Sequence, residues 1–151
     1  MHRFASAAAT AVLLAATVVF AAPAGAAAST SGAKIVAIYF DSPGSDTGSN
    51  ASLTAEWVQI RNSTSTTKTL TNWTLRDKSN HVYVLPSFTL RAGATAKIHS
   101  GHGTKSAANL YWNQSWYVWN NTGDTAYLRN AAGKAVSTCA YTKASTPKKT
   151  C

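Results

Sequence analysis

The chain has 151 residues and a formal net charge of +9 at pH 7, from 14 Lys and Arg against five Asp and Glu. This length supports one hydrophobic core and is too short for two domains. An excess of positive charge favours anionic polymers such as nucleic acid, cell-wall polymers or acidic glycans, or it simply keeps the protein soluble.

The first residues are typical of a secretory signal peptide. His2 and Arg3 form a positive start, an apolar run covers residues 11–22, and small residues follow. The apolar run is too short for a membrane-spanning helix, which needs about 20 residues. We therefore predict a signal peptide over residues 1–28, a short leader over residues 29–33, and a secreted, extracellular protein.

The rest of the chain has short apolar stretches separated by turn residues, and we find no helical period with capping residues at its ends. Strands are predicted at residues 34–40, 53–62, 73–75, 82–85, 94–99, 125–129 and 134–141. Short strands at this spacing indicate an all-β sandwich.

The stretch around Trp119 is predicted to be a hairpin that organises the fold. An apolar run enters the turn, Gly123 can adopt a positive φ, and Asp124 can bond its own backbone. In the strand that leaves the turn, Ala126 and Leu128 share one face, as in a half-buried strand.

Two cysteines lie near the C-terminus, Cys139 and Cys151. Outside the cytoplasm such a pair usually forms a disulfide, and no histidine nearby in sequence suggests a metal site or a catalytic thiol. We predict a bridge that ties the basic tail, residues 143–151, back onto the last strand and stabilises the fold by about 3 kcal/mol.

Several motifs in order resemble the lamin-tail domain. They lie at residues 56–62, 70–77, 85–93, 99–103 and 119–124. The resemblance implies an immunoglobulin-like β-sandwich over residues 34–142. The positions that define this fold are Glu56, Trp57, Trp73, Trp119, Gly123 and Asp124.

The family resemblance implies an interaction module. In nuclear lamins this domain is linked to DNA, chromatin and protein binding, and similar bacterial domains occur in exported proteins. The sequence shows neither a rod-forming coiled coil nor a nuclease domain beside it. It departs from the family pattern at Gln59, where an acidic residue is often found, and in its cysteine-containing tail.

Catalytic chemistry has weak support in the sequence. Glu56 and Asp124 could form a carboxylate pair or a Ca²⁺ site, but backbone capping is the simpler role. His99 and His102 lack a helix that would set metal-ligand spacing, so ordinary surface histidines are favoured. We expect no enzyme activity, no metal site and no cofactor.

Two kinds of binding surface remain open. Basic side chains on outward faces would bind phosphate backbones without reading bases. Exposed aromatic residues around positions 112–119 would instead bind a neutral glycan or an extracellular protein. The candidate residues are Arg61, Arg76, Lys97 and Arg129 for the first surface, and Trp116 and Tyr117 for the second. A purely structural role is the third alternative.

Overall fold

The computed structural model describes residues 32–143 and 146–151. The predicted signal peptide, residues 1–28, lies outside these residues. Among the residues described, no helix is both long and apolar enough to cross a membrane.

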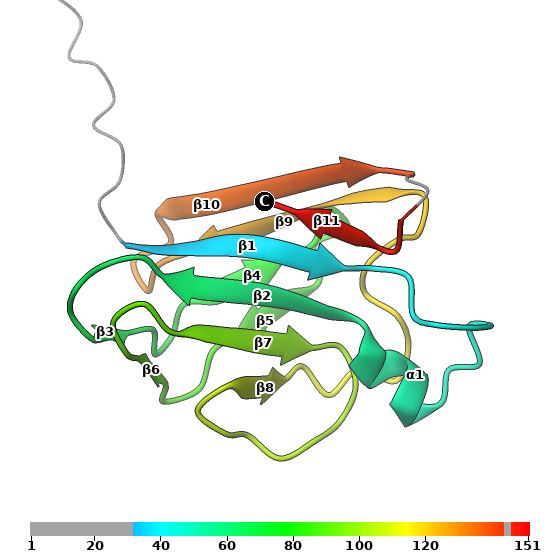
Figure 1. Ribbon diagram of the computed structural model, residues 1–151, viewed down its shortest axis with the longest axis horizontal. Coiled ribbons are helices and arrows are strands. Elements are labelled where there is room, and N and C mark those ends of the chain that lie inside the picture. Colours follow the sequence, from blue (N-terminus) through cyan, green and yellow to red (C-terminus); the bar gives the residue numbers. More distant parts are fainter. Residues whose placement is uncertain (1–31, 144–145) are drawn as a thin grey trace, which may run out of the picture.

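A five-stranded sheet forms one layer of the fold (Figure 1). Its neighbouring strands are antiparallel except for β7 and β8, which are parallel. Its spatial order is β11 (Lys148–Thr150), β1 (Ala33–Tyr39), β2 (Trp57–Asn62), β7 (Thr95–His99) and β8 (Asn109–Tyr111).

A four-stranded antiparallel sheet forms the second layer. Its order is β10 (Ala135–Thr142), β9 (Gly123–Arg129), β4 (Thr74–Arg76) and β5 (Val82–Val84). A separate two-stranded ribbon pairs β3 (Lys68–Thr69) with β6 (Thr89–Leu90).

The core fills the space between the two sheets, and the alternation of side chains along each strand places residues there. In β9, Ala126 and Leu128 are buried while Thr125, Tyr127 and Arg129 face outward. In β2, buried residues likewise alternate with outward ones. The largest fully buried side chains include Trp119, Ile38, Ile60, Leu75, Ile98, Leu110 and Leu128.

A short helix, α1 (Asn50–Ala55), corrects the prediction of a strand over residues 53–62. The hydroxyl of Ser49 accepts a hydrogen bond from the amide of Ser52 and caps the first turn, as serine commonly does. Leu53 then points into the core, and the strand begins only at Trp57.

The predicted hairpin around Trp119 is wrong. Strand β8 ends at Tyr111 in the five-stranded sheet, whereas β9 begins at Gly123 in the four-stranded sheet. The segment between them crosses from one layer to the other and buries Trp119 on the way. Gly123 has a φ of 132°, and a Cβ there would lie 3.1 Å from the carbonyl oxygen of Tyr141.

The predicted disulfide between Cys139 and Cys151 is confirmed, but the tail does not pair with the last strand. Residues of β11 pair with β1 instead, and the amide of Cys151 donates to the carbonyl of Val36 at 2.9 Å. Because Cys139 belongs to β10, the disulfide joins the two sheets at one side of the sandwich.

Candidate functional site

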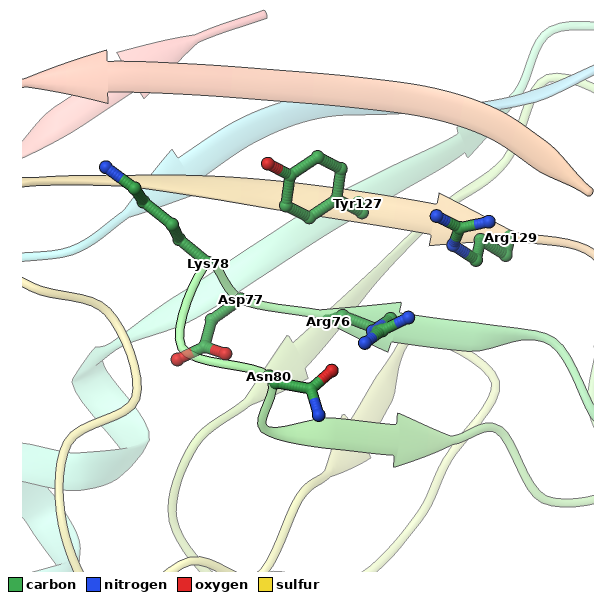
Figure 2. A pocket seen from close by; sticks show the side chains of 6 residues that line it. All are labelled: Arg76, Asp77, Lys78, Asn80, Tyr127 and Arg129. Atoms are coloured by element: carbon green, nitrogen blue, oxygen red, sulfur yellow. The ribbon is translucent and has the colours of Figure 1, made fainter. Parts of the chain in front are cut away.

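A hollow of about 310 Å³ lies on the outer face of the four-stranded sheet (Figure 2). Strands β4 and β9 pair with Thr74 opposite Arg129 and Arg76 opposite Tyr127. This register places Arg76 and Arg129, which are 53 positions apart in the sequence, on the same patch of surface. The lining residues are Arg76, Asp77, Lys78, Asn80, Tyr127 and Arg129.

The turn between β4 and β5 fixes one wall of this basic hollow. Asp77 is buried, and its carboxylate accepts a hydrogen bond from the His81 amide at 2.7 Å and contacts His81 Nδ1 at 2.6 Å. Asp124 accepts from the Lys78 amide at 2.9 Å, and Asn80 adopts a φ of 73°. Hydrogen bonds to the carboxylates of Asp77 and Asp124 therefore hold the turn, and the basic side chains take no part in them.

The cations of the basic hollow form no ion pair within 4.0 Å in the described residues. Figure 2 shows the carboxylate of Asp77 pointing away from the guanidinium groups of Arg76 and Arg129. Across residues 32–143 and 146–151, the one ion pair within 4.0 Å joins Asp77 to His81. Arg129 donates from Nη1 to the carbonyl of Gly133 at 3.0 Å, which holds its guanidinium in place. The hollow therefore has three basic side chains and one buried carboxylate, that of Asp77, in its lining.

The other two predicted cations lie elsewhere. Arg61 on β2 and Lys97 on β7 face outward from the five-stranded sheet, on the opposite side of the sandwich. There the Lys97 Nζ lies 4.2 Å from the centre of the Trp57 ring. The four predicted residues thus form two separate pairs, and the structure does not unite them in one surface.

The aromatic residues at positions 112–119 do not form a continuous exposed strip. Trp112 and Trp119 are buried and meet edge to face at 6.1 Å. The hydroxyl of Tyr117 lies 2.5 Å from Ser52 Oγ, which anchors the loop to α1. Trp116 alone among these tryptophans is exposed, at 62%, and its ring rests against Gly48.

The two carboxylates that could have formed a catalytic pair are engaged by the backbone. Glu56 accepts hydrogen bonds from the amides of Val118 at 3.0 Å and Trp119 at 2.9 Å, and from the Ser100 hydroxyl. Burial raises the pKa of Glu56 to about 7, although these hydrogen bonds act in the opposite direction. Asp124 accepts from the amides of Lys78 and Thr125. Both arrangements serve the fold.

The histidines also have local partners. His99 Nδ1 donates to the carbonyl of Thr54 at 2.6 Å, and its Nε2 lies 2.9 Å from Asn109 Oδ1. Within the part of the chain that the structure describes, no three His, Cys, Asp or Glu side chains gather as a metal site.

Lys78, Asn80 and Tyr127 were missed as site residues by sequence reasoning. Tyr127 alternates with buried Ala126 and Leu128, so its outward direction could have been predicted. Lys78 and Asn80 lie in the turn that follows Arg76, but only the pairing of β4 with β9 brings that turn beside Arg129.

Two packed β-sheets with a disulfide between the layers form an immunoglobulin-like β-sandwich, and a basic hollow lies on one of its outer faces. The family model of the Lamin Tail Domain matches residues 26–143. The chain therefore belongs to the lamin tail domain family, which confirms the resemblance. No curated protein matches the chain.

Proposed function

We propose that this protein is an exported, non-catalytic module that binds anionic polymers, including nucleic acid or an anionic cell-wall polymer, through the basic hollow. The observation that carries the proposal is that Arg76, Lys78 and Arg129 line one hollow and form no ion pair within 4.0 Å in the described residues. The Cys139–Cys151 disulfide and the signal-like residues 1–28 support export.

The chemistry suits a phosphodiester backbone. Guanidinium groups present parallel N–H donors that match phosphate oxygens, and Lys78 adds a mobile point charge. Tyr127 and Asn80 contribute neutral hydrogen-bonding groups at the rim. The basic side chains lie on strands and in a turn around a shallow hollow, so we expect contacts with the phosphate backbone of the polymer and low sequence specificity.

Duplex DNA binding measured across a salt series tests the proposal. If all three cations contact phosphates, the logarithm of the binding constant falls against the logarithm of salt concentration with a slope of about −2.7. The double variant Arg76→Ala/Arg129→Ala is expected to reduce the magnitude of that slope by about 1.8.

Arg61→Ala/Lys97→Ala is the matched control, because it removes the same charge from the opposite outer face. Its slope should stay close to that of the original chain. Equal losses in both double variants would show that the whole positive surface, rather than the hollow, holds the polymer. Salt-independent binding would reject the electrostatic proposal.

A second candidate function rests on the exposed ring of Trp116. Such a ring can stack on a sugar or pack against a protein surface, with little dependence on salt. Trp116→Ala should then abolish binding to a neutral polysaccharide while DNA binding persists. If DNA and polysaccharide both fail to bind, a protein partner or a purely structural role is favoured.

A further inference from the structure

Strand β5 is an edge strand that exposes apolar side chains. In the described part of the chain it pairs with β4 and with no other strand. Val82 is 44% exposed and Val84 is 54% exposed, and with Trp116 they make up the exposed large hydrophobic residues among those described. An exposed apolar edge of this kind is a template for pairing with another chain.

The backbone of β5 also has free hydrogen-bonding groups along this edge. The carbonyl of His81 accepts from Asp77, and the amide of Leu85 donates to Trp73 at 2.8 Å, so both residues turn their peptide groups toward β4. Because this direction alternates along an antiparallel strand, Val82 and Val84 direct their N–H and C=O groups away from β4.

The other sheet edges are closed by local contacts. On β8, Asn109 donates from its amide to Ser106 Oγ and accepts from the Ser106 amide at 2.8 Å. Strand β10 is joined to β11 by the disulfide, and Ser137 Oγ accepts from the amide of Ile35 at 3.1 Å. Strand β11 carries two exposed lysines, which discourage pairing. Strand β5 lacks these protections.

A pocket of about 340 Å³ lies beside the open edge. Tyr83, Val84 and Pro86 form one wall, while Tyr111 and Lys105 belong to the opposite wall, on and before β8. The pocket therefore lies between the open edge strand β5 of one sheet and the edge strand β8 of the other. A strand added beside β5 would direct alternate side chains inward, toward this pocket.

The charge around this edge selects among possible occupants. The pocket lining contains Lys105 and no acidic residue. A second copy of this chain would bring another strongly positive surface, because each chain has a net charge of +9. Like charge disfavours that pairing, whereas an acidic segment would be attracted.

From these features we propose that the open edge of β5 and its pocket bind an extended, acidic segment of a partner protein by strand addition. The partner's backbone pairs with Val82 and Val84, one apolar side chain enters the pocket beside Tyr83 and Tyr111, and an acidic residue lies next to Lys105. Main-chain bonds supply affinity in this mode, and the pocket supplies specificity. This proposal rests on different residues from polymer binding, although Val82 lies opposite Arg76 of the basic hollow in the β4–β5 pairing.

The probe is a capped eight-residue peptide in which valine alternates with glutamate or threonine. Its control is the same peptide with methyl groups on alternate amide nitrogens, which keeps side chains and charge but removes donors. Strand addition predicts that the first peptide slows amide hydrogen exchange at Val82 and Val84 by at least about tenfold, while the methylated peptide has no effect.

Val84→Pro removes the outward amide and leaves the β4 ladder intact, because proline is tolerated on the free side of an edge strand. We expect it to weaken peptide binding at least about tenfold, whereas Val84→Thr stays within about threefold. Circular dichroism checks that both variants fold. If Val84→Pro does not fold, the comparison of the plain and methylated peptides on the original chain still tests the proposal.

Three results would overturn the proposal. The first is equal binding of the plain and methylated peptides, and the second is protection at amides away from β5. The third is a dimer in analytical ultracentrifugation that Val84→Pro abolishes, since the occupant would then be a second copy of the chain.

Discussion

Titration of Glu56 should make the folded protein less stable as the pH rises toward neutrality. The side chain is fully buried, and loss of hydration raises its pKa from 4.5 to about 7. The folded state therefore holds this proton more tightly than the unfolded chain does. Its contribution to stability is complete below pH 4.5 and is lost as the pH rises through about 7.

The pKa difference sets the size of the effect. It corresponds to about 3 kcal/mol over the full range, of which about 2.5 kcal/mol is lost between about pH 5 and about pH 8. Urea unfolding followed by tryptophan fluorescence at several pH values in this interval measures the loss. The reporter is sensitive, because Trp119 is buried and donates its amide to this carboxylate.

Glu56→Gln is the companion variant. Its amide does not titrate, so the part of the pH dependence due to Glu56 disappears. The substitution should also lower the free energy of unfolding by about 1–3 kcal/mol at low pH. The NH2 group of the new side chain would face the backbone N–H of Val118 or Trp119, and two donors cannot bond to each other.

Identical pH slopes for the original chain and Glu56→Gln would refute this reasoning. Such a result would mean that the three hydrogen-bond donors keep the carboxylate ionised across this range despite its burial. A slope of opposite sign, with stability rising toward neutrality, would lead to the same conclusion.

Three further predictions concern stability. Replacing both Cys139 and Cys151 by serine should lower the free energy of unfolding by about 3 kcal/mol and speed amide exchange in β11; unchanged exchange there would show that β11 holds by itself. Gly48→Ala should cost at least about 1 kcal/mol and change Trp116 fluorescence, since Gly48 has a φ of +66° and its Cβ would lie 2.5 Å from the ring; an unchanged melting temperature and spectrum would contradict this. Asn62→Ala should cost about 2–4 kcal/mol in urea unfolding, because its buried amide bonds the carbonyls at 66, 90 and 91, and a loss below about 1 kcal/mol would show that water replaces those bonds.

The limits of sequence reasoning are clearest at α1 and at the crossover before β9. Helix α1 spans only Asn50–Ala55, too short to show a helical period, and its one local signal is the capping Ser49. The sequence predicts one hairpin that includes Trp112 and Trp119, because both lie in the stretch that precedes the turn residues 120–124. In the structure both side chains are buried in the same core and meet edge to face, an arrangement that follows from tertiary contacts and not from a local pattern.

The sequence by itself determined the all-β class, the family and the disulfide. It also determined which face of each strand is buried, because side chains alternate with a period of two whatever the strand pairs with. Tertiary structure decided which strands are neighbours. The pairing of β4 with β9 brings Arg76 and Arg129 to the same patch of surface. Because β2 and β7 belong to the other sheet, Arg61 and Lys97 lie on the opposite outer face. Which basic side chains become neighbours on the surface depends on such long-range strand pairing, whereas which side chains of a strand are buried depends on the local alternation of apolar and polar residues.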